Sequence, residues 1–519
     1  MQIFIFIKRI FTISVIFLKY AIKKTYVDEY GKKQKLNNPV RLRFVFQDLG
    51  GVFMKFGQIL AMRFDVLPID YAISLLNLLD NAPKVSDEKI FSVFFNEIGK
   101  NIGEVFSNFT GVSISTASFA QVYKGMYKGD VVIIKIQKPK VKQYIKSDLL
   151  LLGFFTIIID WIGVLKAVSM QEVVFQLKDW LREELNYTIE TCNNQTIYDH
   201  VKKHKLENVI IPKVYHEFAT GKVLVQEFLN GFQVNKIING LIKNPIKTKL
   251  TLKENNIDPL EVANLFIRDI MRQYFIDGFF HADPHPANLM IFPGNKVGYM
   301  DFGIIGKIKS DNHGMLKYIR ASANLEFHSA AKGITEIIEL RIKNELGETL
   351  HKKGFKKAFD IILNFITDKL TEDFTPITND WHFSAGNKNL GLKQRSSAVT
   401  FLKVVKTVEK YNMKFPSDVI AFVRTLLIID MVCLKLSDDF NMVKAINSFF
   451  DEHSLDDVKV MSSEHMEEVE RIHEIVYTSR SHEYRKDKEH GMKERFADIV
   501  YTLAEKYPEL YNKMKGIRI

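Results

Sequence analysis

The stretch GFFHADPHPANLM, residues 278 to 290, carries Asp283 and Asn288 on one predicted loop, and VGYMDFG at 297 to 303 adds Asp301. Asp283, four intervening residues and Asn288, followed by Asp301 in an Asp-Phe-Gly run, supply a loop acid and two oxygen ligands. Phosphoryl transfer requires this set, because Mg²⁺ bridges phosphate oxygens while a carboxylate orients the attacking group. Each motif alone is weak, but together at this spacing they indicate a phosphoryl-transfer site.

The residues around this stretch predict a helix before the loop and a hairpin after it. Asp258, Pro259 and Glu261 are typical of a helix start, and Gly278 can end that helix. The run FPGNK predicts a turn between two antiparallel strands. Counting outward from the turn places Asn288 opposite Asp301, with Cβ atoms about 5 Å apart, so both side chains could hold one cation or two neighbouring ones.

A kinase-type site also needs a lysine on the phosphates and a carboxylate to hold it. The strand-like run VVIIK ends at Lys135, which is the natural candidate; the alternative is a strand-end lysine that reaches water. Glu190, or less favourably Glu184, on a helix predicted over LREELNYTIETCNN is the candidate partner, against a solvated helix face. Upstream, STASFAQV has Ala117 and Ala120 where a phosphate-covering loop normally has glycine, so an ordinary protein kinase is excluded.

Composition sets the outer limits of the interpretation. The chain has 519 residues, 46% of them hydrophobic, which allows two or three packed units. Its net charge of +11 favours anionic partners, but no motif supports nucleic acid. The two cysteines, Cys192 and Cys433, exclude a disulfide framework and favour a reducing compartment.

The N-terminal segment, residues 1–26, predicts a basic amphipathic helix in a membrane interface. Its apolar run is interrupted by Lys8 and Arg9 and is too short to span a bilayer. A signal peptide, a short span and simple docking on the protein are the alternatives. The charge around residues 19–43 favours an anionic membrane surface as the partner.

Several motifs, in order, resemble the UbiB/ABC1/AarF family of atypical kinase-like proteins. The run LGGVFMKFGQILAMRFDVLP resembles the KxGQ segment of that family, ASFAQVYKG and VVIIKIQKP resemble its alanine-rich loop and lysine strand, and HADPHPANLM with MDFG resembles its catalytic and metal-binding loops. PSDVIAFVRTLL at 416 to 427 is similar to its C-terminal helices. The combination of KxGQ with HxDPHPxN is highly specific.

The resemblance implies a role for each matching residue. Lys135 would bind the phosphates with Glu190 as its ion-pair partner, Asp283 would be the catalytic-loop acid, and Asn288 and Asp301 would hold Mg²⁺. The resemblance implies three further groups of residues. The adenine hinge would be formed by Gln226, Glu227 and Phe228, and the loop over the nucleotide by Ala117, Ser118 and Gln121. The regulatory KxGQ cover would include Lys55, Gln58 and Glu184. Gly57, Arg63, Asp65 and Pro68 belong to the same KxGQ segment, whose helix face is expected to fold over the active site.

The expected fold is therefore α+β: a two-lobed, protein-kinase-like fold with a KxGQ helical extension and a helical C-terminal tail. The expected boundaries, after the N-terminal helix, are 27–105 for the extension, 106–228 and 229–435 for the lobes, and 436–519 for the tail. The resemblance implies an ATPase or small-molecule kinase that uses ATP and Mg²⁺. It would support isoprenoid quinone synthesis, with quinone precursors or their biosynthetic enzymes as partners, at the cytoplasmic face of a membrane, expected to be a bacterial inner membrane.

Three departures from the family pattern stand out. Ser115 and Thr116 replace alanines, which bears on nucleotide preference, and Asn186 stands where the ExD motif has aspartate after Glu184. The tail has no apolar run of spanning length. Two other functions remain open: a phosphotransferase of the aminoglycoside or choline kinase type, and a scaffold that responds to ATP without fast turnover.

Overall fold

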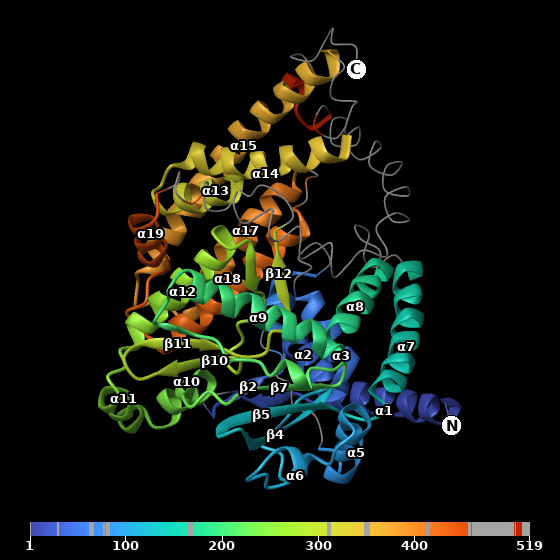
Figure 1. Ribbon diagram of the computed structural model, residues 1–519. Helices are drawn as coiled ribbons and strands as arrows, with labels where there is room; N and C mark the ends of the chain where they lie inside the picture. Colours follow the sequence, from blue (N-terminus) through green and yellow to red (C-terminus); the bar gives the residue numbers. More distant parts are fainter. Residues whose placement is uncertain are drawn as a thin grey trace. The chain divides into compact units, whose positions relative to one another are not determined.

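The structure is a computed structural model, drawn as a ribbon in Figure 1. It divides into two compact units, Met1–Asn255 with Ala287–Ile304, and Asn256–Pro286 with Ile305–Ile519. The predicted boundary between the lobes, at 228/229, lies within the first unit and stays a prediction. The structure describes residues 2–28, 31–61, 67–75, 78, 84–162, 170–308, 313–346, 353–411, 413, 415–454, 458, 503 and 505–510.

A four-stranded antiparallel sheet in the first unit carries the predicted lysine strand. Its order is β3-β4-β5-β7, formed by β3 (Ser115–Thr116), β4 (Ala120–Tyr127), β5 (Asp130–Gln137) and β7 (Val223–Glu227). Alternate side chains of a strand point to opposite faces. In β5, Val132, Ile134 and Ile136 are buried in the cluster that includes α5 (Asp87–Ile98), so Lys135 faces the other side of the sheet.

A second four-stranded sheet in the same unit carries the predicted hairpin. Its order is β6-β11-β10-β8, with β6 (Val209–Ile210), β8 (Phe232–Gln233), β10 (Leu289–Phe292) and β11 (Lys296–Tyr299). β10 and β11 are antiparallel, as predicted, and are joined by Pro293, Gly294 and Asn295. A short pair, β1 (Thr25–Val27) and β2 (Lys33–Lys35), completes the described strands of this unit.

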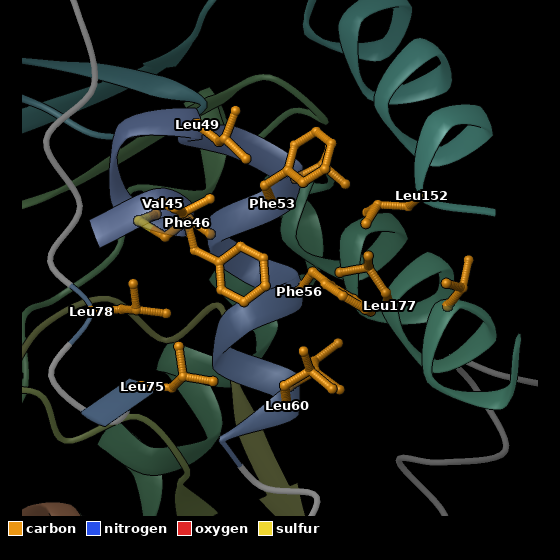
Figure 2. Close-up of a cluster of buried hydrophobic side chains, with 14 of the residues drawn as sticks. Val45, Phe46, Leu49, Phe53, Phe56, Leu60, Leu75, Leu78, Leu152 and Leu177 are labelled. Atoms are coloured by element: carbon orange, nitrogen blue, oxygen red, sulfur yellow. The ribbon is translucent and has the colours of Figure 1, made fainter. Parts of the chain in front are cut away.

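Helix α3 (Gly51–Leu60), which carries Lys55, packs against α2, α4, α7 and α8 of the first unit. Phe53 and Phe56 of α3 lie in one apolar cluster with Phe46 of α2, Leu152 of α7 and Leu177 of α8 (Figure 2). The other described helices of the unit are α1 (Gln2–Ile22), α2 (Asn38–Leu49), α4 (Ile69–Leu75), α6 (Ile102–Val105), α7 (Val141–Ile162), α8 (Met170–Glu184), α9 (Tyr187–Lys203), η1 (His216–Phe218), α10 (Val234–Lys243) and α11 (Pro245–Glu254).

The second unit is built on α12 (Pro259–Phe275), which starts as predicted. The side chain of Asp258 accepts a hydrogen bond from Leu260 N at 2.8 Å, and Pro259 occupies the first turn. Strands β9 (Phe279–His281) and β12 (Ile305–Lys307) pair antiparallel beside it. The remaining helices are α13 (His313–Ala323), α14 (Phe327–Leu346), α15 (Lys353–Ala385), α16 (Leu392–Arg395), α17 (Ser397–Glu409), α18 (Ser417–Leu436) and α19 (Met442–Glu452).

The helix predicted over LREELNYTIETCNN is wrong as a single element, because the chain forms two helices there. α8 ends at Glu184, and Asn186 caps α9 by accepting hydrogen bonds from Thr188 N at 3.2 Å and Thr188 Oγ1 at 2.7 Å. An N-cap residue has non-helical backbone angles, so a helix cannot continue through it. The break places Glu184 and Glu190 on different helices.

Two predictions concern the cysteines, which are not expected to form a disulfide framework, and the helices, which are not expected to span a membrane. Cys192 is exposed and Cys433 is buried, and both are free thiols. Within the residues that the structure describes, none of the helices has both the length and the apolarity that crossing a bilayer requires. Most of the predicted tail lies outside those residues, as do Arg63 and Asp65.

Candidate active site

Lys135 lies between two carboxylates in the first unit. Its Nζ atom is 2.8 Å from Oε1 and 2.9 Å from Oε2 of Glu190, and 3.3 Å from Oδ2 of Asp301. The ring of Tyr187, in the first turn of α9, has its centroid 5.1 Å from the same nitrogen. The structure therefore brings together three predicted residues that are far apart in the sequence.

The charges of this cluster fix the protonation states of Lys135 and Asp301. Burial lowers the pKa of Lys135, but Asp301 and Glu190 outweigh it and hold that pKa well above its usual value. Burial raises the pKa of Asp301, yet Lys135 and Lys55 reverse this effect and hold it below its usual value. Lys135 is thus a cation and Asp301 a carboxylate at neutral pH, as phosphate and metal binding require.

The capped start of α9 sets the position of Glu190. Asn186 is the N-cap residue, and Glu190 lies in the first turn after it, where a carboxylate is also favoured by the positive end of the helix. Asparagine and aspartate are about equally good N-caps. The departure from the family pattern at Asn186 is therefore compatible with an intact α9, although it removes one negative charge.

The predicted pairing of Asn288 with Asp301 is wrong by one residue. Phe292 pairs with Lys296 and Leu289 with Tyr299, and Met300 N donates to Asn288 O at 2.8 Å, so Asn288 lies opposite Met300. The prediction assumed a two-residue turn, whereas three residues form the loop, and its Gly294 and Asn295 both have positive φ. An odd number of loop residues shifts the register by one.

Asp301 lies just beyond β11, where the strand alternation no longer applies. Its φ is +62°, a left-handed conformation that is uncommon outside glycine and redirects the chain. Gly303 leaves space beside the carboxylate, since a Cβ there would lie 3.2 Å from Asp301 Oδ1. With a carboxylate from Asp301 and an amide oxygen from Asn288, the donor set fits Mg²⁺, which prefers oxygen ligands.

Lys55 of α3 is held by two residues of α8. Its Nζ atom is 2.6 Å from Oε1 of Glu184 and 5.4 Å from the ring centroid of Trp180, and the residue is buried. Gln58, one turn further along α3, has a buried Oε1 atom that accepts no hydrogen bond from the part of the chain that the structure describes. Gly57 is required by packing, because a Cβ would lie 2.6 Å from Phe46 Cδ2. Glu184 therefore pairs with Lys55, and Glu190 with Lys135.

The alanine-rich loop is closed by contacts that the sequence interpretation missed. Ala117 N donates to Ala120 O at 3.0 Å, and Ala117 O accepts from the buried Lys138 Nζ at 2.7 Å. Ser118 lies within this turn, partly buried.

Gln121 does not match the predicted position over a nucleotide. Its side chain is fully buried and bonds to Val85 N, Asp87 and the Tyr123 hydroxyl, where it holds the start of α5. The correction follows from strand alternation, since Gln121 and Tyr123 point to the same face of β4.

Of the predicted hinge residues, Gln226 and Glu227 are the last two residues of β7, and Phe228 follows the strand. Glu227 N donates to Lys213 O at 2.8 Å, and Phe228 N donates to Val131 O at 2.9 Å. The Gln226 side chain faces Asn194, at 3.5 Å. An adenine placed at this segment would therefore have to bond to carbonyl groups or to later residues, because these two N–H groups are already used.

Asp283 belongs to the second unit, where a buried arginine holds it. Arg424 Nη2 of α18 donates to Asp283 Oδ1 at 3.1 Å, and Arg424 Nη1 lies 3.4 Å from Ala282 O. Asp283 N also donates to Nδ1 of the buried His281, at 3.2 Å. The loop HADPHPAN contains no lysine or arginine, so α18 supplies the positive charge beside the predicted catalytic acid.

A buried ionic network fixes the strand that delivers this loop. Arg272 pairs with Asp269 at 2.9 Å and with Asp277, and Gln273 donates to Asp269 at 2.6 Å. Gln273 Oε1 in turn accepts from His281 N at 2.9 Å. Satisfied buried networks of this kind are rigid, so the backbone before Asp283 is firmly positioned.

Comparison with known proteins assigns the family. Residues 77–332 match the ABC1 atypical kinase-like domain. The chain contains an ABC1 atypical kinase-like domain. This confirms the predicted UbiB/ABC1/AarF membership and, at the level of fold class, a kinase-like arrangement of helices and sheets.

Three curated relatives show how far the similarity extends. A protein from the hydrogenase 1 5′ region of Clostridium pasteurianum is 28% identical over 420 residues, 79% of this chain and 70% of the relative. A chloroplastic aarF domain-containing protein kinase of Arabidopsis thaliana is 25% identical over 417 residues, 79% of this chain and 74% of the relative. The chloroplastic protein ACTIVITY OF BC1 COMPLEX KINASE 3 of the same plant is 26% identical over 343 residues, 65% of this chain and 46% of the relative.

Among solved structures, the Rv3197–erythromycin complex from Mycobacterium tuberculosis is 25% identical and has a TM-score of 0.38, covering 57% of this chain and 71% of that one.

The sequence interpretation missed three residues that contact predicted site residues: Arg424, Trp180 and Lys138. Arg424 lies 141 positions from Asp283, on a helix recognised only by its resemblance to the C-terminal helices of the family. Lys138 directly follows the end of β5, three residues after Lys135. A basic residue this close to the lysine strand could have been predicted to contact the alanine-rich loop.

Proposed function

We propose that this ABC1 protein is a Mg²⁺-dependent ATP-binding enzyme, an atypical kinase or ATPase. The observation that carries the proposal is the position of the Lys135 ammonium, shared between Glu190 and Asp301 in the first unit. Phosphoryl-transfer sites use a lysine held by a glutamate to bind phosphates, beside a carboxylate that holds the metal.

Each residue has a definite part in the proposed reaction. Lys135 binds the α and β phosphates, and Glu190 keeps its ammonium in place. Asp301 and Asn288 would hold Mg²⁺, which when bound neutralises negative charge on the phosphate oxygens. Asp283 orients the attacking hydroxyl, of water or of an alcohol, and accepts its proton. Arg424 keeps the Asp283 carboxylate in one position.

We further propose that the enzyme acts at an anionic membrane surface, on the cytoplasmic side, and supports isoprenoid quinone synthesis. Support comes from α1, which turns an apolar face outward while Arg9 pairs with Asp148 at 2.7 Å on the protein side. The exposed apolar side chains of α1 are Ile7, Ile10, Phe11, Val15, Phe17, Leu18 and Ile22. A helix with this distribution binds in the interface of a bilayer.

A regulatory role for the KxGQ segment forms part of the proposal. The pairing of Lys55 with Glu184 inside the first unit favours a switch that reports nucleotide binding, as an ATP-responsive scaffold would need. A protein that hydrolyses ATP slowly can also act as a scaffold. The measured rate of ATP turnover distinguishes such a scaffold from an enzyme with fast turnover.

The central test combines ATP turnover with nucleotide-dependent thermal shift for the wild type, Asp301→Asn and Lys55→Ala, with and without anionic vesicles. We expect a Mg·ATP-dependent stabilisation of the wild type that Asp301→Asn loses. If the wild type shows none, or the Asp301→Asn protein behaves identically, the catalytic assignment is wrong. Quinone content in a deletion strain tests the pathway, and quinones unchanged from the wild type would contradict it.

A further inference from the structure

Lys138 holds the loop between β3 and β4 by two hydrogen bonds. Its backbone N–H donates to Phe119 O at 2.8 Å, and its Nζ atom donates to Ala117 O at 2.7 Å. Lys138 directly follows β5 and is 7% exposed. Burying an ammonium group is unfavourable unless the protein supplies hydrogen-bond acceptors, so the contact with Ala117 helps to offset the burial of Lys138.

The loop needs contacts of this kind, because its own residues are unusual for so tight a turn. The pairing of β3 with β4 continues to a hydrogen bond from Ala117 N to Ala120 O at 3.0 Å, which leaves Ser118 and Phe119 as a two-residue turn. Two-residue hairpin turns usually require positive φ, and hence glycine or asparagine. Both turn residues here have negative φ, and neither is glycine or asparagine. The turn therefore depends on contacts from outside it, and Lys138 supplies two of them.

The side chain of Phe119 is a second anchor of the same turn. It is 7% exposed and lies in the apolar cluster that includes Phe53 and Met54 of α3. A Cβ at Gly51, the first residue of α3, would lie 4.0 Å from Phe119 Cε1. The turn is thus attached to the end of β5 through Lys138 and to α3 through Phe119.

The loop lies beside the proposed phosphate site. Ala117 and Ala120 pack with Tyr187 and Leu224 in a small apolar cluster. The centroid of the Tyr187 ring is 5.1 Å from the Nζ atom of Lys135, the residue that binds phosphates in the proposed reaction. A displacement of the loop would therefore change the surroundings of the proposed nucleotide.

We propose that Lys138 is a positioning residue that clamps the loop of residues 117–120 over the nucleotide, and this step rests on the proposed function. The clamp orders the loop before ATP binds, so ordering it does not reduce the affinity. Without the ammonium group the loop would also populate open conformations. The apparent affinity then falls in proportion to the fraction of molecules whose loop is still closed.

The variant Lys138→Met tests the clamp, because methionine keeps much of the length of the side chain and lacks the ammonium group. The Kd for Mg·ATP and the KM for ATP should each rise about tenfold, since a hydrogen bond from a charged donor is lost. The kcat should change less than about twofold, because a closed loop binds substrate and transition state alike. Lys100→Met, at an exposed lysine, is the matched control and should behave like the wild type.

Two further variants test whether the charge and the loop are the cause. Arginine at position 138 can also donate to Ala117 O, so Lys138→Arg should bring the KM to within about threefold of the wild type. Phe119→Ala releases the second anchor. Its effect on the Kd and that of Lys138→Met should be less than additive in the double variant, because either change frees the same turn. Far-UV circular dichroism confirms folding, and Lys138→Gln replaces Lys138→Met if the latter does not fold.

Hydrogen exchange without nucleotide distinguishes a failure of the clamp from a failure of the proposed function. In Lys138→Met the amides of residues 117–120 should exchange at least about tenfold faster than in the wild type, while those of α10 stay unchanged. This difference in a protein whose wild type binds no Mg·ATP would contradict the proposed function alone. A wild type that binds Mg·ATP, with unchanged exchange and KM in Lys138→Met, would overturn the clamp alone, even if that variant melts at a lower temperature.

Discussion

Replacing Glu190 by glutamine tests the ion pair at the centre of the site. The variant keeps the size of the side chain but removes the charge that accepts from Lys135 at 2.8 and 2.9 Å. Hydrogen bonds to charged groups contribute about 1.5–3 kcal/mol. Asp301, 3.3 Å away, still neutralises Lys135, so the cost should lie in that range and below the 3–5 kcal/mol typical of a fully orphaned buried ion.

The assay is thermal unfolding with and without Mg·ATP. A loss of stability of this size should make the variant melt about 5 °C below the wild type, given roughly 2–4 °C per kcal/mol for a unit of this size. Lys135 is then held by Asp301 alone, away from the phosphates, and the apparent affinity for ATP should fall about tenfold.

Glu372→Gln is the matched control, because Glu372 pairs with Lys369 at 3.1 Å on the surface and is 67% exposed. Exposed pairs contribute about 0–1 kcal/mol. A Glu190→Gln protein that melts like this control and binds ATP like the wild type would refute the assignment of Glu190.

Three further predictions concern other parts of the fold. Asn186→Ala should cost about 1 kcal/mol by removing the cap of α9 and should weaken ATP binding through Glu190, whereas Asn186→Asp should preserve both; thermal shift and nucleotide titration measure this. Arg424→Met should lower kcat for ATP turnover at least tenfold with little change in KM, because Asp283 loses its buried partner, and Arg424→Lys should restore part of the rate; equal kcat values would contradict this. Burial raises the pKa of Asp430, on α18, to about 7 from 3.8. Its contribution to stability is therefore complete below about pH 4 and lost as pH rises to 7, by up to about 4 kcal/mol, so Asp430→Asn should flatten the pH profile of chemical denaturation between these limits.

The parts of the fold that sequence predicted well depend on local patterns. Strand β5 with Lys135 follows from the alternation in VVIIK, and α12 follows from the cap at Asp258 and Pro259. Each pattern is complete within a few residues, so tertiary contacts did not need to be known.

The errors arose where one residue changes the geometry. Pro293 lengthened the hairpin loop to three residues, which moved Asn288 from Asp301 to Met300. Asn186 was interpreted as a lost charge, although its side chain begins a helix. Arg424 could not be predicted because its partner lies 141 positions away. The pair of Lys135 with Glu190 was predicted, with Glu184 as the less favoured partner, and the structure has this pair. The ion pair of Lys55 with Glu184 was not predicted, because its two residues lie far apart in the sequence.

The close packing at Gly57 has a consequence for how the KxGQ segment can change during evolution. Phe46 and Leu78 lie on the same side of α3 near this glycine (Figure 2), and a Cβ would meet them at 2.6 and 2.7 Å. Lys55, two residues earlier, is instead constrained by an ion pair with α8. Two nearby residues of one motif are therefore constrained by different interactions. Position 57 should covary with the volume of residues 46 and 78, and position 55 should covary with the charge of residue 184.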